Sequence, residues 1–351
     1  MNRDGEAALM SAATRSRAES PAAEGALDRA MSVIERLRAR MQAQVKGRDD
    51  VIDLVLVALL ADGHVLLEDF PGSGKTTLAK TLGSSIVHES DEGIADFRRI
   101  QFTPDLLPSD VTGVSVFDAS TSTFQFRRGP IFATVVLADE INRTSPKVQS
   151  AMLEAMAEKQ VTVDNRTYPL DELFFVIATQ NPLDVAGTYP LPVPQLDRFL
   201  FKIRMQHIDR SAELDVLDTY RERRDTQRSD LPRVSRDELI EARRAIDEQV
   251  AIGSEIKVCL VDLTRALRED ERVVQGNSTR SLVLMLPALQ AYAALHGRDY
   301  VTSDDIEALA PRVLQHRVEL APGVMNFDDV LRESLVAPLE ALARSTLRKR
   351  A

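Results

Sequence analysis

The sequence predicts an α/β fold in which a parallel five-stranded sheet lies between helices and is followed by a smaller all-α domain. Between residues 28 and 207, short apolar runs of strand type alternate with helical patterns, which is typical of a parallel sheet covered by helices. From residue 208 to 351, the strand pattern gives way to amphipathic helical patterns. The five expected strands are Val65–Glu68, Arg98–Phe102, Thr134–Ala138, Phe174–Ala178 and Phe199–Ile203.

Length and composition are compatible with two folded domains preceded by a tail. The chain has 351 residues, of which 44% are apolar, enough for a sizeable core. Residues 1–27 are rich in Ala, Ser, Arg and Glu without a long apolar pattern, and we expect a flexible tail there. Cys259 is the only cysteine, which excludes an internal disulfide and a cysteine-based zinc cluster; its apolar helical surroundings predict a core residue.

Charge and hydropathy argue against several other classes of protein. The net charge of −10 disfavours a dedicated nucleic-acid surface. The five histidines lack the spacing of metal ligands, and we expect them in surface or structural roles. No run of 18 apolar residues occurs and Met1 is followed by a polar stretch, so we expect neither a membrane span nor a secretory signal, and a cytoplasmic protein.

The helical part of the chain carries helix-start signals of its own. Ser235 with Glu238, and Thr302 with Asp305, have the spacing of capping boxes. Pro287 lies inside an apolar helical pattern, where it should kink the helix or mark its first turn.

A glycine-rich turn follows the first expected strand and precedes a helix, the usual setting of a phosphate-binding loop. Gly72 and Gly74 would let backbone N–H groups approach an anion without a Cβ in the way. Lys75 would reach the β- and γ-phosphates, and the hydroxyl of Thr76 would ligate Mg²⁺. This segment predicts a site for a nucleoside triphosphate; the alternative is an ordinary strand–turn–helix corner that contains Gly-Lys-Thr.

One position of this turn departs from the usual pattern Gly-x-x-x-x-Gly-Lys-Ser/Thr. Its first glycine is Asp69 here. Aspartate tolerates a left-handed backbone better than most residues, so the turn can still form. A carboxylate close to phosphates would, however, lower the affinity for nucleotide.

Two further strand ends carry polar groups that triphosphate hydrolysis requires. The apolar run 134–138 ends in Asp139 and Glu140, at the edge of the sheet where ligands bind in open α/β folds. Asp139 would hold Mg²⁺ through its water shell, and Glu140 would polarise the attacking water. The run 174–178 leads to Asn181, whose amide could orient that water. The alternatives are a solvated acidic strand end and an Asn-Pro turn.

Two arginines are candidates for stabilising the charge that develops on a transferring phosphoryl group. Arg198 precedes the last expected strand, and Arg280 lies at an expected helix start in the second domain. Taken singly, each is also compatible with a surface salt bridge.

The order of these motifs resembles an AAA+ ATPase, and the segments between them resemble the MoxR family in particular. The segments that carry the resemblance are residues 102–113, 129–132, 137–143, 178–182, 187–192 and 195–199. The match runs from about Gln44 to residue 301, with departures at Asp69, Pro194 and Pro287. It implies an AAA+ core over 28–207 and a helical lid domain over 208–351, with ATP and Mg²⁺ as cofactors.

The resemblance also implies a role for each candidate residue. Those implied to bind the nucleotide are Val45 and Gly47 near the adenine, and Gly72, Ser73, Gly74, Lys75, Thr76 and Thr77 of the Walker A turn. Those implied to act in hydrolysis are the Walker B pair Asp139 and Glu140, Asn181 as sensor 1, Arg280 as sensor 2 and Arg198 as the arginine finger. Thr76 and Asp139 would serve the metal. An arginine finger in such ATPases acts on the nucleotide of the neighbouring subunit.

The same resemblance implies an assembly and a class of partner. Residues 106–126 and 160–169 resemble hairpins that face the central pore of a ring. Because the interface that the finger requires is head-to-tail, we expect a homo-oligomer, a hexameric ring or a spiral. The family is associated with von Willebrand factor A domain proteins, so the expected function is an ATP-driven chaperone or remodeller of such partners.

Two other functions remain open from the sequence. One is a DNA-acting AAA+ motor, although the hairpins offer few cations besides Arg127, Arg128 and Arg166, so nucleic acid is not the expected partner. The other is a nucleotide-gated scaffold that hydrolyses slowly and mainly exchanges partners.

Overall fold

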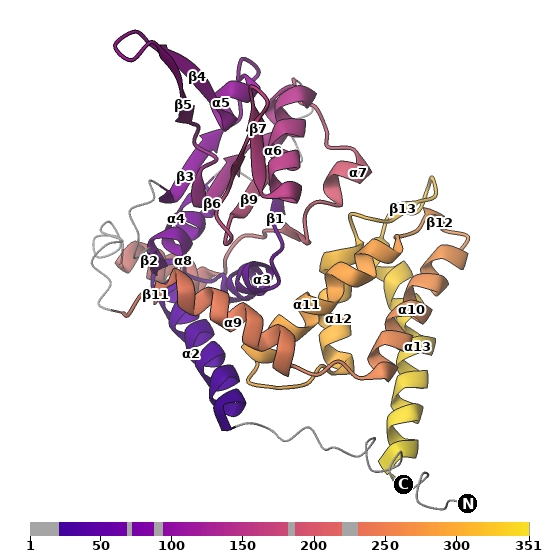
Figure 1. Ribbon diagram of the computed structural model, residues 1–351. Helices are drawn as coiled ribbons and strands as arrows, with labels where there is room; N and C mark the ends of the chain where they lie inside the picture. The colour runs from indigo at the N-terminus through magenta and orange to yellow at the C-terminus, as the bar shows by residue number, and fades with distance from the viewer. Residues whose placement is uncertain (1–20, 69–71, 88–93, 182–186, 220–230, 351) are drawn as a thin grey trace, which may run out of the picture.

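The computed structural model describes residues 21–68, 72–87, 94–181, 187–219 and 231–350. Its centre is a parallel five-stranded sheet in the order β10-β1-β9-β6-β3, as predicted (Figure 1). The strands are β1 (Val65–Glu68), β3 (Ala95–Gln101), β6 (Ala133–Asp139), β9 (Phe175–Gln180) and β10 (Phe201–Arg204). The bounds of β1 are those expected; β3 begins before the expected Arg98, and β10 begins after the expected Phe199.

The sheet is buried on both faces because its central strands are continuous apolar runs. Successive side chains of β6 enter different cores: Val135 packs in one apolar cluster and Val136 in the other. Leu66 and Leu67 of β1 divide in the same way. This alternation follows from the two-residue period of a strand. Because the sheet is packed on both faces, it is a rigid support for the polar residues at the carboxyl ends of its strands.

Helices cover the sheet and form the second domain (Figure 1). Those of the core are α2 (Pro21–Gln44), α3 (Asp49–Leu60), α4 (Lys75–Ser85), the short α5 (Pro108–Thr112), α6 (Pro146–Glu158) and α7 (Val193–Leu196), with a 3₁₀ turn at Ile141–Arg143. Those after the core are α8 (Arg210–Asp218), α9 (Arg236–Gln249), α10 (Ser254–Glu269), α11 (Thr279–Leu295), α12 (Ser303–Leu314) and α13 (Phe327–Arg350).

The N-terminal boundary differs from the expectation. Helix α2 begins at Pro21, whereas the tail was expected to run through residue 27. Leu27 and Ala30 are buried in the same apolar cluster, so the helix packs on the core within its first turns. Residues 1–20 of the expected tail lie outside the described part of the chain.

The helical domain confirms the predicted start signals. At α9, Ser235 Oγ accepts from Glu238 N–H at 3.1 Å and Glu238 Oε2 accepts from Ser235 N–H at 2.7 Å. The second box, Thr302 with Asp305, caps α12 in the same manner. Pro287 lies inside α11, and Cys259 is buried in α10 as expected.

Two short strand pairs had not been expected. The strands β12 (Val273–Gln275) and β13 (Glu319–Leu320) pair within the otherwise helical domain. The second pair is parallel and joins β2 (Ile86–Val87) of the core to β11 (Val234–Ser235), directly before α9.

Both expected hairpins are present, although the first lies later than the expected 106–126 because α5 occupies 108–112, and an aromatic contact joins them. The first is β4 (Gly113–Asp118) with β5 (Thr123–Arg128), and the second is β7 (Gln160–Val163) with β8 (Arg166–Pro169). Phe126 of the first stacks on Tyr168 of the second, with ring centroids 4.0 Å apart and planes inclined by 18°.

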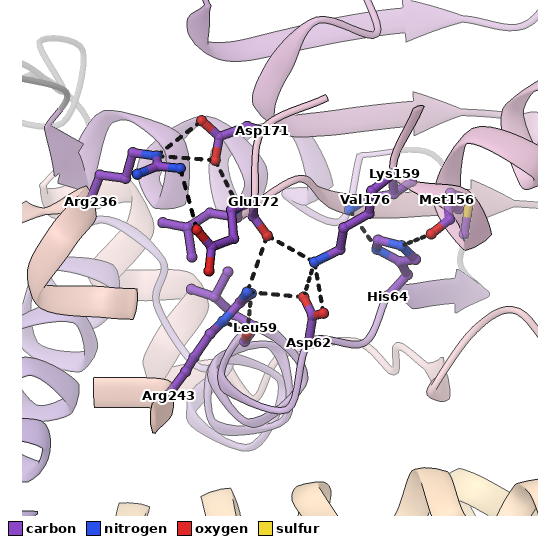
Figure 2. Close-up of polar contacts among 11 residues, drawn as sticks. Leu59, Asp62, His64, Met156, Lys159, Asp171, Glu172, Val176, Arg236 and Arg243 are labelled. Atoms are coloured by element: carbon purple, nitrogen blue, oxygen red, sulfur yellow. Dashed lines mark hydrogen bonds and ion pairs between the residues drawn. The ribbon is translucent and has the colours of Figure 1, made fainter. Parts of the chain in front are cut away.

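A polar cluster anchors the base of the second hairpin to α9 (Figure 2). Lys159, directly before β7, donates to both carboxylate oxygens of Asp62 at 2.6 and 2.7 Å. Arg243 of α9 reaches the same Asp62 at 2.9 Å. On the other side of the hairpin, Arg236 of α9 pairs with Asp171 at 3.1 Å. Helix α9 is therefore tied to both ends of the hairpin.

Candidate functional site

The glycine-rich turn has the backbone geometry of an anion cradle. Gly72 and Gly74 have φ of +91° and +92°, a left-handed conformation that favours glycine. No described atom lies within 4 Å of the position that a Cβ would take at either residue, so the space above the turn is open. Helix α4 begins at Lys75, directly after Gly74, so the turn leads into a helix N-terminus, where backbone N–H groups favour an anion. Asp69, with its expected effect on affinity, lies outside the described residues.

This turn lines a cavity of about 290 Å³ together with the other two predicted motifs. The predicted residues in its lining are Gly72, Ser73, Gly74, Lys75, Thr76, Thr77, Asp139, Glu140 and Asn181. The ends of β6 and β9 bring the carboxylates and the amide here, because the two strands are parallel neighbours. The sequence did not single out the other lining residues, Arg99, Gln101, Thr179 and Gln180.

A second cavity, of about 440 Å³, continues from the first around the turn. Both share Gly72, Ser73, Gly74 and Thr77, and the second extends to Val45. Gly47, between the lining residues Lys46 and Arg48, has φ +66°; a Cβ there would be 2.5 Å from the Cβ of Ala212, so glycine is needed for α8 to approach. A separate space therefore adjoins the turn on the side of Val45, one of the residues expected near the adenine.

The far wall of this second cavity was not predicted. It consists of Gln206, His207 and Ile208 after β10, and of Glu213 and Val216 on α8. These residues form no sequence motif. The only available signal was their position directly after the last strand of the sheet.

Asp139 is held at the end of β6 by two partners. Thr179 Oγ1 donates to its Oδ1 at 2.7 Å, and Arg99 donates to its Oδ2 from Nε at 3.0 Å and from Nη2 at 2.5 Å. Asp139 as a whole is 8% exposed, so these contacts fix the direction of its carboxylate. The Asp139 carboxylate and the hydroxyl of Thr76, which line the same cavity, are oxygen ligands of the kind that Mg²⁺ takes.

Glu140 has a strained backbone at the same edge. Its φ of +58° and ψ of +50° are left-handed, which is uncommon for a non-glycine residue and typical of functional sites. Thr179 Oγ1 accepts its N–H at 2.9 Å, and Gln101 Nε2 donates to its Oε2 at 2.8 Å. Arg99 Nη2 in turn donates to Gln101 Oε1 at 2.6 Å. Two residues on one face of β3 thus restrain both acidic side chains.

The cavity also meets a further condition for holding a triphosphate. Ser73 Oγ is buried in the turn without a hydrogen-bond partner among the described residues. A buried hydroxyl without a partner is costly, and an anion in the cradle would supply one. The residues present therefore fit a nucleotide with its metal ion.

The two predicted arginines lie elsewhere. Neither Arg198 nor Arg280 belongs to the described lining of the two cavities. Arg280 Nε is 3.6 Å from Asp197 Oδ2, beside Arg198. Arg198 is partly exposed, and within the described residues its guanidinium has no carboxylate partner. The structure thus brings Asn181 to the turn, and places Arg280 against Asp197, the residue before Arg198, outside the described lining of the two cavities.

Comparisons with known proteins find relatives along most of the chain. The model of the ATPase family associated with various cellular activities (AAA) matches residues 64–201, and that of the AAA lid domain matches residues 265–334. YeaC of Bacillus subtilis is 47% identical over 305 residues, 87% of this chain and 92% of YeaC. The chaperone MoxR1 of Mycobacterium tuberculosis is 35% identical over 304 residues, 82% of this chain and 76% of MoxR1.

A solved structure shares the fold. The crystal structure of a Cytophaga hutchinsonii protein assigned as an ATPase matches with a TM-score of 0.81 and 35% identity, over 90% of this chain and 96% of that chain. In the described part of the present chain, we find no helix with the length and apolar character needed to cross a membrane.

Proposed function

The chain belongs to the MoxR family of AAA+ ATPases, and from this premise we propose that it hydrolyses Mg²⁺-bound ATP between adjacent copies of itself to remodel partner proteins. The observation that carries the proposal is the single cavity lined by the glycine-rich turn, Asp139, Glu140 and Asn181. These are the groups needed to bind phosphates, hold a metal and direct water, and they come from three separate segments of the chain.

The two adjoining cavities suggest how ATP is held. The triphosphate would lie over the turn, with backbone N–H groups and Lys75 on its oxygens. The base would occupy the second cavity, between Val45 and the wall that α8 supplies. Thr76 and Asp139 would hold Mg²⁺, which when bound neutralises charge on the phosphates.

Hydrolysis would use the strained edge of the sheet. The Glu140 carboxylate would accept a proton from water as the water oxygen attacks the γ-phosphorus, and ADP and phosphate would leave. The Asn181 amide, in the same cavity, would orient that water. Gln101, which now donates to Glu140 at 2.8 Å, would have to release that carboxylate for it to act as a base.

The position of the two arginines supports catalysis between subunits. Arg280 pairs with Asp197, the residue directly before Arg198, and neither arginine belongs to the described lining of the cavities of its own chain. We therefore propose that both act on the nucleotide of a neighbour. A head-to-tail contact of this kind closes into a ring or continues as a spiral. A hexameric ring is the assembly that we propose.

The hairpins are the proposed contact with partner proteins. Phe117 and Phe124 are 54% and 70% exposed on the first hairpin, with ring centroids 5.3 Å apart. Exposed aromatic pairs of this kind favour contact with apolar segments of polypeptide. A von Willebrand factor A domain protein is the partner class that we propose, as client or adaptor.

The test uses two variants of the cavity. Glu140→Gln should bind ATP and assemble but hydrolyse at least about 100-fold more slowly, because only the proton acceptor is lost. Lys75→Ala should lose nucleotide binding. Fluorescent-nucleotide titration, mass photometry and phosphate release measure the three properties, and Glu140→Gln with ATP serves as bait for partners. Equal hydrolysis by Glu140→Gln and the parent would contradict the proposed role of Glu140.

A further inference from the structure

The residue directly before Arg198 is held by two arginines of the helical domain. Arg317 Nε donates to Asp197 Oδ1 at 2.6 Å, and Arg280 Nε lies 3.6 Å from Asp197 Oδ2. Asp197 belongs to the turn that follows α7, and its side chain is 24% exposed. One carboxylate of the core therefore connects the segment that carries Arg198 with the helical domain.

Arg317 makes further contacts with this segment. It lies in the turn after α12 and is 3% exposed. Its Nη2 donates to the backbone carbonyls of Asp197 at 3.2 Å and Phe199 at 2.7 Å, and its Nη1 donates to that of Leu200 at 3.2 Å. A second bond from Nη1 reaches the carbonyl of Val313 in α12. With the bond from Nε, every N–H of the guanidinium has an acceptor.

The neighbours of Arg317 contact the same stretch. His316 is buried, its pKa is held well below the ordinary value by that burial, and its Nε2 lies 3.0 Å from the carbonyl oxygen of Phe199. Gln315 Nε2 donates to the carbonyl of Lys202 in β10 at 2.5 Å. The turn 315–317 thus runs along residues 197–202 of the core.

Burying the guanidinium of Arg317 costs more free energy than an apolar contact that would join the two domains equally well. Removing a cation from water carries a large penalty, and apolar side chains of similar volume often pack at lower cost. A planar guanidinium can, however, hold several carbonyl groups in a fixed geometry at the same time, because its N–H donors are rigidly arranged. The carbonyls that Arg317 fixes are those on both sides of Arg198.

We infer that Arg317 is a positioning residue for hydrolysis in the adjacent subunit: it fixes the backbone on both sides of Arg198, and it shares the carboxylate of Asp197 with Arg280. This inference rests on the proposed function, because it requires that Arg198 act between subunits. It also makes the helical domain of one subunit responsible for the geometry of its neighbour's reaction.

The test is a mixing experiment with two inactive proteins. The acceptor, Arg198→Ala, keeps its phosphate turn; the donor, Lys75→Ala, keeps its finger. Neither should hydrolyse ATP alone, and their mixture should recover activity. Arg317→Lys keeps the positive charge but loses the planar arrangement of N–H groups that bind the carbonyls. Placed in the donor, it should lower the recovered rate at least tenfold; placed in the acceptor, it should change the rate less than twofold.

Comparing the substitution in the donor with the same substitution in the acceptor distinguishes a positioning role of Arg317 from a role in folding. Equal losses in donor and acceptor would show a merely structural role and overturn the inference, as would a donor that is unaffected. Arg312→Lys, in α12 shortly before that turn, is the matched control and should leave the donor active. No recovery in the parental mixture would overturn the proposed function itself, and the inference with it. Thermal melting reports folding; if Arg317→Lys is unfolded, Asp197→Asn in the donor replaces it, with the same donor-only loss expected.

Discussion

Thr179 joins the two acidic residues of the site: its hydroxyl donates to Asp139 Oδ1 at 2.7 Å and accepts the N–H of Glu140 at 2.9 Å. One buried side chain on β9 thus sets the direction of the proposed metal ligand and supports the strained backbone of the proposed base. Its position follows from the parallel pairing of β6 with β9.

Thr179→Val should damage both stability and catalysis. Valine has nearly the same shape but leaves the Glu140 N–H and one Asp139 oxygen without a partner, at a cost of about 1–3 kcal/mol in the free energy of unfolding. We also expect kcat to fall about tenfold, by analogy with the loss of a single polar contact in a reaction site. Urea denaturation and steady-state ATPase rates measure the two effects.

The control for this variant is Thr162→Val on the second hairpin, where the threonine is exposed. A surface substitution of this kind should change the free energy of unfolding by no more than about 0.5 kcal/mol. If Thr179→Val behaved like Thr162→Val in both measurements, the assigned role of Thr179 would be wrong.

Arg99→Met should increase the apparent affinity for Mg²⁺. In the structure, the Arg99 guanidinium pairs with the carboxylate of Asp139, so it competes with a metal ion at that oxygen. Its side chain is 48% exposed, and a pair so accessible to solvent is worth at most about 1 kcal/mol, or roughly fivefold in affinity. The Mg²⁺ concentration for half-maximal binding of a fluorescent ATP analogue should therefore fall about two- to fivefold.

Arg98→Met tests whether this effect depends on position. Arg98 is the neighbouring arginine of β3, and its side chain points to the other face of the strand. The two variants lose the same charge, so an equal shift in Mg²⁺ midpoint would indicate a general electrostatic effect and not a contact with Asp139.

His64 should make the protein less stable in mild acid. Burial lowers its pKa from 6.5 to about 4. The N–H of Val176 donates to Nδ1 at 3.2 Å, so Nε2 carries the proton that is donated to the carbonyl of Met156 at 3.1 Å (Figure 2). Between pH 6.5 and about 4, the unfolded chain therefore binds a proton at His64 that the folded chain does not.

The free energy of unfolding should fall by about 3 kcal/mol from this residue as the pH drops through that window, and should change no further below it. His64→Gln removes the titration, so its urea midpoint should depend less steeply on pH than that of the parent. Above pH 7, where histidine is neutral in both states, the two profiles should run parallel. Identical profiles throughout would contradict the prediction.

The elements that could be predicted from sequence are those encoded in local patterns. The phosphate turn after β1 and the acidic pair after β6 each lie within one strand end, and the two capping boxes lie within single helix starts. The sheet could be predicted because its strands are continuous apolar runs. Even the partners Asp139 and Asn181 could be placed at one edge, since parallel strands end on the same side.

What could not be predicted depends on which segments meet. Arg99 was part of an expected strand, but its contact with Asp139 follows from β3 lying beside β6. Arg280 was expected to act as sensor 2, in its own subunit or the next, but its contact with Asp197 within this chain follows from the orientation of the helical domain. The start of α2 was placed too late, although Leu27 and Ala30 have the i, i+3 spacing of one helix face, and both are buried in the apolar cluster.

The stack of Phe126 on Tyr168 has a mechanical consequence. The stacked rings join the first hairpin to the second. We therefore expect a displacement of one hairpin to move the other. Helix α9 is linked to both ends of the second hairpin. Arg243 pairs with Asp62, which also binds Lys159, and Arg236 pairs with Asp171. We therefore expect α9 and the two hairpins to move as one rigid unit. The proposed partner polypeptide would then contact one continuous surface formed by both hairpins.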